Sequence, residues 1–64
     1  MPKIRRGNLI FLQWVGDHSP RHVHVYQDGR LVVKWDLENV RAMEGMASRG
    51  VRRLIDQLES EGGL

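Results

Sequence analysis

Apolar and polar side chains alternate over 22–26 and over most of 30–37, with the period of two that β-strands require. Three segments, 8–15, 22–26 and 30–37, are rich in β-branched, aromatic and leucine side chains. Turn-favouring residues separate them, at 16–20, which include Gly and Pro, and at the Asp-Gly pair 28–29. The pattern therefore predicts three strands, with a loop after the first and a tight turn after the second.

The side-chain pattern also predicts how the second and third strands pair. A two-residue turn at 28–29 would put the histidines of one strand on the same face as the valine and tryptophan of the other. A three-residue turn over 27–29, with Gly29 in a left-handed bulge, pairs Tyr26 with Arg30 and gathers the apolar side chains on one face. We expect this turn. The apolar face then carries Val23, Val25, Leu31, Val33, Trp35 and Leu37, and the open face carries His22, His24, Tyr26, Val32, Lys34 and Asp36.

The first strand has one wholly apolar face and one mixed face. The apolar face carries Ile10, Leu12 and Trp14, and the mixed face carries Leu9, Phe11, Gln13 and Val15. We expect Phe11 to share the open face with Tyr26, where aromatic rings could stack on the bases of RNA. The apolar members of the mixed face, Leu9, Phe11 and Val15, could equally form a contact surface for a second copy or a partner protein.

The last third of the chain changes to helical periodicity. Glu38 and Asn39 indicate a further turn, which leaves room for a short fourth strand over 40–44. Ser48 is a suitable helix N-cap, and the Gly pair 62–63 provides a stop. The predicted fold class is α+β, an antiparallel meander of three or four strands with one C-terminal helix packed on one face. The expected core is Val23, Val25, Val33, Trp35, Val51, Leu54 and Leu58.

A chain of 64 residues forms a single domain, 1–64, with a small core. It contains no Cys, which excludes a disulfide and is compatible with a reducing compartment. The longest apolar run, 9–12, is too short for a signal peptide or a membrane span. We therefore expect a cytoplasmic protein with no membrane contact. Homo- or hetero-oligomerisation or a bound metal would supply the stability that the core lacks.

The net charge is only +2, but the basic residues are clustered near both ends of the chain. Such clusters suit an anionic partner, although they also serve simply as solvated surface charge. The candidate nucleic-acid-binding residues are Arg5, Arg6, Arg21, Lys34, Arg49, Arg52 and Arg53.

All three histidines lie within seven residues, 18–24, and this cluster is the main candidate for chemistry. Residues i and i+2 of a strand share a face, so the Cα atoms of His22 and His24 lie roughly 6–7 Å apart. With His18 they could bind Zn²⁺ or a similar divalent metal, and Asp17 could complete the ligand set. Without a metal, the imidazoles could act as general base and acid in RNA cleavage, with Lys34, expected opposite His22, stabilising negative charge. They could also simply cap loop carbonyls and pack on Tyr26.

The run Gly-Asp-His-Ser-Pro-Arg-His-Val-His-Val at 16–25 resembles the G-D-H-x-P-P-H-x-H-V motif of a family of small bacterial proteins, domain of unknown function family 4160. The Met-Pro start, the Asp-Gly turn and the C-terminal helix are similar as well. Arg21 stands where the family usually has a second Pro, which implies a less rigid and more basic loop. The resemblance implies that the key residues are Asp17, His18, His22 and His24, which we take as the candidate catalytic set.

Members of that family are often encoded beside another small protein, in an arrangement like a toxin–antitoxin pair. The resemblance therefore implies a bacterial component of such a pair, which binds the protein encoded in the same operon and binds or cleaves RNA. One alternative is a metal-binding domain or metal-dependent hydrolase with Zn²⁺ on His18, His22 and His24; otherwise no cofactor is expected. Another alternative is a non-catalytic protein-interaction module.

Overall fold

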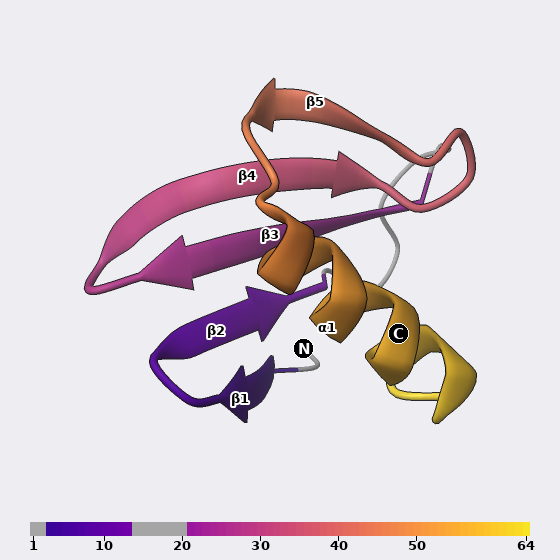
Figure 1. The fold of residues 1–64 in the computed structure, drawn as a ribbon, viewed down its shortest axis with the longest axis horizontal. Coiled ribbons are helices and arrows are strands. Elements are labelled where there is room, and N and C mark those ends of the chain that lie inside the picture. The colour runs from indigo at the N-terminus through magenta and orange to yellow at the C-terminus, as the bar shows by residue number, and fades with distance from the viewer. Residues whose placement is uncertain (1–2, 14–20) are drawn as a thin grey trace.

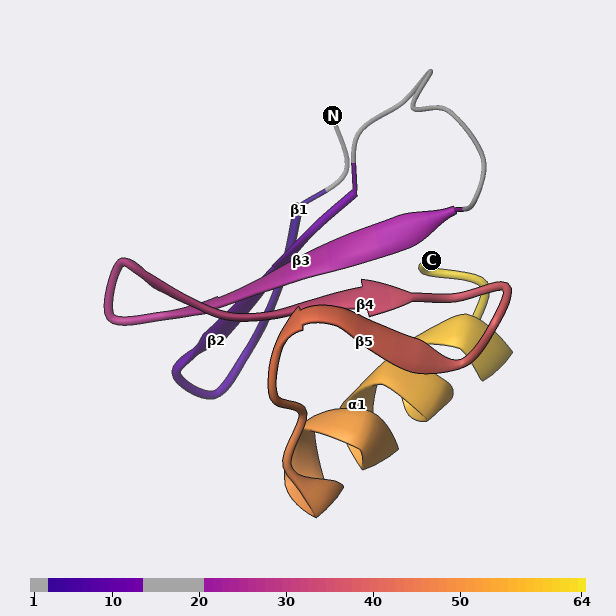
Figure 2. The same cartoon turned by 90° about the horizontal axis from the view of Figure 1, so that it is seen from above.

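The computed structural model describes residues 3–13 and 21–64, which form a sheet and a helix in two layers (Figures 1 and 2). Neighbouring strands along the chain are also neighbours in the sheet and pair antiparallel. The predicted α+β meander with a C-terminal helix is confirmed, but the sheet has five strands where three or four were expected. The elements are β1 (Lys3–Arg6), β2 (Leu9–Leu12), β3 (His22–Gln27), β4 (Arg30–Asp36), β5 (Arg41–Gly45) and α1 (Arg49–Ser60).

Strand β1 is the element that sequence reasoning missed. Three of its four residues are basic, so it shows no apolar alternation. It pairs with β2 through a two-residue turn, in which Gly7 has a φ of 61° and Asn8 follows. Gly at the first central position is typical of a type II′ hairpin turn. The Gly-Asn pair was therefore the available signal for this hairpin.

The turn between β3 and β4 corrects the predicted pairing. Asp28 and Gly29 have φ values of 54° and 78°, as in the two-residue turns of Asp-Gly hairpins. Gln27 therefore pairs with Arg30, and the predicted three-residue turn was wrong.

A β-bulge in β4 nevertheless restores the predicted faces. The pairing shifts between Val25 and Tyr26, so that Val25 faces Val33 whereas Tyr26 faces Leu31. The extra residue on β4 is Val32, which returns the strand to an even offset and so keeps the apolar side chains together. The two residues at the bulge itself differ from the prediction, because Leu31 is exposed and Val32 packs against the core.

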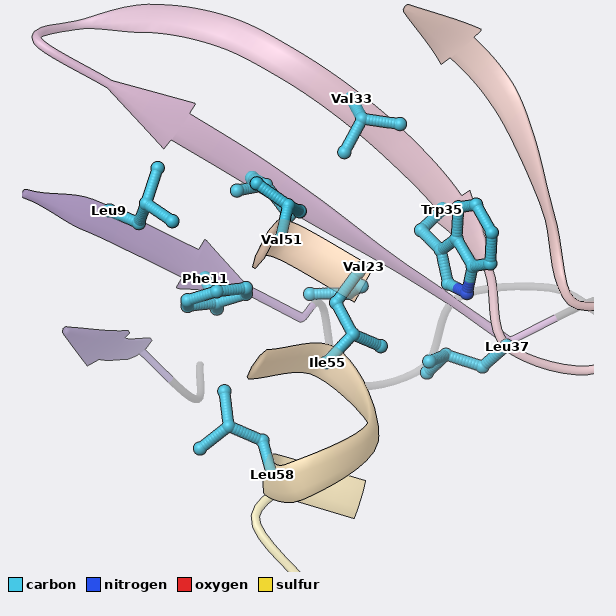
Figure 3. Close-up of a cluster of buried hydrophobic side chains, with 10 residues drawn as sticks. Leu9, Phe11, Val23, Val33, Trp35, Leu37, Val51, Ile55 and Leu58 are labelled. Atoms are coloured by element: carbon cyan, nitrogen blue, oxygen red, sulfur yellow. The ribbon is translucent and has the colours of Figure 1, made fainter. Parts of the chain in front are cut away.

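Helix α1 covers one face of the sheet. The backbone N–H of Val51 donates to the Ser48 hydroxyl at 3.2 Å, which confirms the predicted N-cap. Val51, Ile55 and Leu58 form the buried face of the helix, and Leu54, predicted to belong to the core, is only half-buried beside it. Figure 3 shows Val51, Ile55 and Leu58 directed into the space between helix and sheet. The sheet contributes Leu9, Phe11, Val23, Val25, Val33, Trp35 and, from the next turn, Leu37.

The predicted facing of the first strand was wrong. Leu9 and Phe11 are 8% and 1% exposed and belong to the core under α1. The cause is the pairing of Phe11 with Val25, which places it on the covered face, while Ile10 faces Tyr26 on the other side. Because both faces of β2 are apolar, its own pattern could not select the buried one.

Candidate functional site

The face of the sheet opposite α1, called the open face below, carries three rings in a row along β3. His22, His24 and Tyr26 occupy alternate positions and are half-buried. The ring centroids of His22 and His24 are 5.2 Å apart in an edge-on arrangement, and those of His24 and Tyr26 are 6.4 Å apart and nearly parallel. Both separations fall in the range of favourable ring contacts. The prediction that the two histidines share one face of the sheet is therefore confirmed.

His24 is the centre of a row of side chains that crosses all five strands. Leu12 faces it from β2, and Lys34 faces it from β4. The row continues outward to Lys3 on β1 and Glu44 on β5. Neighbouring strands are about 4.8 Å apart, so the imidazole has an apolar neighbour on one side and a cation on the other.

The pairing of Lys34 corrects an expectation, because Lys34 was expected opposite His22. The two-residue turn and the bulge at Val32 each displace β4 by one residue relative to the predicted offset. The total shift of two residues preserves the faces and changes the partners. His22 consequently faces Asp36.

A second row across the sheet lies two residues further along each strand. Ile10 faces Tyr26, and Arg5 faces Ile10 from β1. This face has a shallow hollow of about 260 Å³. It is lined by residues of both rows and by one residue of the β3–β4 turn, namely Lys3, Leu12, Ile10, Tyr26 and Gly29. The open face thus has an apolar and aromatic floor with cations at the β1 side.

Asp36 has the predicted position on the face of the histidines, opposite His22, but it is only 1% exposed and serves the fold. One carboxylate oxygen accepts from the backbone N–H groups of Glu38 and Asn39, both at 2.9 Å, and the other accepts from Asn39 Nδ2 at 2.7 Å. The bonds from Asn39, side chain first, lower the pKa of Asp36 below its usual 3.8, with smaller help from the Glu38 N–H and the Arg41 charge, and they outweigh the opposing effect of burial. Its carboxylate therefore holds the turn between β4 and β5.

The backbone of Arg21 anchors the start of β3. Its N–H donates to the Glu38 carboxylate at 2.7 Å, and its carbonyl accepts from the N–H of Leu37 at 2.9 Å. These two bonds join the residue before His22 to the same turn that Asp36 closes. The other two residues of the predicted catalytic set, Asp17 and His18, lie outside the described residues.

The basic residues are divided between the two sides of the sheet. Arg5 lies on the open face, whereas Arg6 faces Leu9 on the covered side and forms an ion pair with Glu61 at 3.3 Å. The arginines of the C-terminal cluster lie on α1, on the side opposite the histidines, where Arg49, Arg52 and Arg53 line a groove of about 490 Å³ with Ala47 and Asp56.

Arg52 also has a structural contact on that side. Its guanidinium carbon lies 5.1 Å from the ring centroid of Trp35, which is within the range of a cation–π interaction. Sequence reasoning did not anticipate this contact, nor that Lys3, Ile10 and Leu12 share a face with the histidines. The positions of Ile10 and Leu12 depend on the pairing of β2 with β3, and that of Lys3 depends on the β1–β2 hairpin, for which the Gly-Asn turn was the local sign.

Comparison with known families supplies the remaining observation. The family model described as "Domain of unknown function (DUF4160)" matches residues 7–61. The chain belongs to the DUF4160 family. No curated protein and no solved structure matches it. The match begins in the β1–β2 turn and ends just after α1, so β1, with Lys3 and Arg5, precedes the part shared with the DUF4160 model.

The open face of this DUF4160 protein can support two kinds of chemistry. Two neighbouring imidazoles beside a lysine can transfer protons and stabilise negative charge. Two imidazoles can also supply part of a metal site, but residues 3–13 and 21–64 contain no group of three or more His, Asp or Glu side chains that could hold an ion. Within the same residues, no helix is long and apolar enough to cross a membrane.

Proposed function

We propose that this protein is the RNA-directed component of a toxin–antitoxin-like pair and that its open face binds single-stranded RNA. The observation that carries the proposal is the row of His22, His24 and Tyr26 beside Lys34 on the sheet face opposite α1. Sheet faces with aromatic rings bind unpaired bases by stacking, and neighbouring cations bind the phosphates.

Charge and polarity on the open face agree with this ligand. Lys3 and Arg5 border the face at β1, and Lys34 lies beyond the histidine row at β4. Between them, Ile10 and Leu12 offer apolar contact to a base. A duplex would present its phosphates outward, whereas a single strand can place its bases on the floor and its phosphates on both rims.

His22 and His24 are proposed to cleave the bound RNA. One imidazole removes the proton of a 2′-hydroxyl, whose oxygen attacks the adjacent phosphorus. The bond from phosphorus to the 5′-oxygen breaks, and the other imidazole, in its protonated form, donates the proton to that oxygen. Lys34, opposite His24, stabilises the negative charge of the transition state. The products are a 2′,3′-cyclic phosphate and a 5′-hydroxyl, and no cofactor is consumed.

Binding of a labelled single-stranded RNA, followed by fluorescence anisotropy at several salt concentrations, tests the binding step. We expect the logarithm of affinity to fall linearly with the logarithm of salt concentration, and Lys3→Gln with Arg5→Gln to flatten the slope by about 0.7 per lost phosphate contact. Arg49→Gln with Arg53→Gln is the matched control of equal charge change on α1. If only the α1 variant changes the salt dependence, the RNA binds at the helix and not on the open face. If the wild-type protein binds no RNA at low salt, the proposal is overturned.

Product analysis tests the chemical step separately. We expect His22→Ala and His24→Ala each to slow cleavage by about 10²–10⁴-fold, far more than the roughly tenfold loss of RNA affinity that the removal of one stacked ring would cause. The rate should show a bell-shaped pH dependence, since one imidazole must be neutral and the other protonated. Undiminished cleavage by the double variant would exclude the histidines as catalysts, and RNA binding without cleavage would restrict the function to binding.

The partner protein is proposed to bind along β5, an edge strand of the described sheet. Met43 within the strand is 43% exposed, and Val40 and Met46, which flank the strand, are 56% and 80% exposed. Exposed apolar side chains favour a protein contact. The partner surface expected at Leu9, Phe11 and Val15 was wrong for Leu9 and Phe11, because both are buried in the chain's own core, and Val15 lies outside the described residues. Co-purification with the protein encoded in the same operon should be lost in Met43→Glu with Met46→Glu and kept in Leu31→Glu. Retention by both variants would exclude β5.

A metal site on His22 and His24 is the second candidate function, supported by the 5.2 Å separation of their rings. A metal that binds only the folded state raises the melting temperature. We expect Zn²⁺ to do so in the wild type and not in His24→Ala, with a chelator reversing the effect. The absence of a shift with Zn²⁺, Ni²⁺, Mn²⁺ or Cu²⁺ would exclude this candidate.

A further inference from the structure

The hollow between β1, β2 and β3 has the composition of a small ligand site. Its floor is formed by Ile10, Leu12 and the half-buried ring of Tyr26, and Lys3 stands at its rim. Arg5 lies beside it, since it faces Ile10 from β1. An apolar and aromatic floor with two cations on one side complements a planar base joined to a phosphate.

We propose that this hollow binds one unpaired nucleotide of an RNA strand. The base lies against Tyr26 and the side chains of Ile10 and Leu12, and the phosphate on one side of the nucleotide binds Lys3 and Arg5. This inference rests on the proposed RNA function and adds to it a position at which a single base is held.

The size of the hollow limits the ligand. Its volume of about 260 Å³ lies below the 300–1,000 Å³ of typical drug-sized or cofactor sites. A dinucleotide cofactor would therefore extend far outside it, whereas a single base can be accommodated. Stacking against an aromatic ring tolerates every base, so we expect the site to require a base without selecting strongly among the four.

The position of the hollow relative to His24 gives the site a role in cleavage. Leu12, part of the floor, faces His24 directly, and Lys34 faces His24 from the far side. A nucleotide held in the hollow therefore directs its second phosphate across the strands towards His24 and Lys34. The bound base determines which phosphodiester bond reaches the imidazoles, and Tyr26 acts as a positioning residue for that step.

An abasic scan combined with Tyr26 variants tests the site. A series of RNAs, each with one base removed, is measured for affinity with wild-type protein and with Tyr26→Ala. We expect one abasic position to raise the Kd of the wild type by about tenfold, the effect of losing a base–aromatic stack. Tyr26→Ala should bind the intact RNA about tenfold more weakly and be insensitive to the same abasic position, because the two changes remove one interaction. Tyr26→Phe should keep the wild-type affinity.

Control variants and the cleavage pattern separate the possible outcomes. Leu31 faces Tyr26 from β4 but does not line the hollow, and Arg30 lies at the adjacent turn. Neither Leu31→Ala nor Arg30→Gln should change the affinity for RNA. The cleavage point should stay at a constant distance from the critical base in the wild type and scatter in Tyr26→Ala. Should Tyr26→Ala fail to fold, as judged by thermal unfolding, Ile10→Ala replaces it.

Two negative results have different meanings. RNA binding with no critical abasic position, or with independent effects of the base and of Tyr26, would overturn the nucleotide site while leaving the proposed function intact. Absence of RNA binding by the wild type would overturn the proposed function itself. If the wild type binds no RNA and the Tyr26→Ala substitution weakens binding of the partner protein, the hollow binds a side chain of that protein instead.

Discussion

The two faces of the sheet are built from alternate residues of the same strands, yet they have opposite environments. On the covered face Phe11, Val23 and Val25 are at most 1% exposed, because α1 packs over them. On the open face their neighbours along β2 and β3, including Ile10 and His24, remain half-buried without a helix above them in the described part of the chain.

The comparison shows that apolar content alone does not define the core of this protein. β2 carries Leu and Phe on one face and Ile and Leu on the other, and only the docking of α1 distinguishes them. Apolar side chains left uncovered beside histidine, tyrosine and lysine form a surface suited to a ligand with both apolar and anionic parts. Stability therefore depends mainly on the covered face, and we assign binding to the open face.

Substitution of adjacent residues of β2 gives the largest expected contrast. Phe11→Ala empties a fully buried position and should lower the free energy of unfolding by about 3–5 kcal/mol, which leaves little of the stability of a small domain. Leu12→Ala, on the half-buried open face, should cost about 1 kcal/mol. Urea denaturation measures both, and equal losses would contradict the division of roles.

Asp36 tests the one place where an open-face position serves the fold. Its lowered pKa means that the ionised carboxylate stabilises the folded state. This stabilisation is complete above the usual pKa of 3.8 and disappears as the pH falls through the lower pKa of the folded state. We expect Asp36→Asn to lower the melting temperature at neutral pH and the difference from the wild type to shrink in strong acid. A constant difference across that range would show that the charge is not responsible.

Arg52 provides the smallest and most selective contrast. Its guanidinium lies over Trp35 on the α1 side, so Arg52→Ala should lower the free energy of unfolding by about 0.5–1 kcal/mol. Arg53→Ala, which removes the same charge from the same groove, is the matched control and should change stability less. Neither should change the affinity for RNA on the open face, and a loss of affinity in both would bring the helix into the binding surface.

Much of the fold was predictable because its determinants are local. Alternating apolar side chains identify the covered face of β3 and β4, and Ser48 with the helical repeat identifies α1. The errors occurred where the apolar pattern carries no information. β1 is basic rather than apolar, and the extra residue that we placed in a three-residue turn over 27–29 lies instead in the bulge at Val32.

The candidate site divides in the same way. The placement of His22 and His24 on the same face follows from strand alternation alone, so it could be predicted. The contributions of Lys3, Ile10 and Leu12 depend on which strands pair and in which register, which are long-range properties of the sheet. Lys34 was placed on the correct face with the wrong partner, because a shift by two residues preserves the face and changes the neighbour.

The most direct test of the central claim is a titration of methyl-labelled protein with single-stranded RNA, followed by NMR. Ile10 and Leu12 report on the open face, whereas Ile55 and Leu58 report on the core beneath α1. We expect the methyl signals of Ile10 and Leu12 to shift in proportion to saturation and those of Ile55 and Leu58 to stay in place. Shifts confined to the methyls of α1, or no shifts at RNA concentrations that saturate binding, would contradict the assignment of the open face as the binding surface.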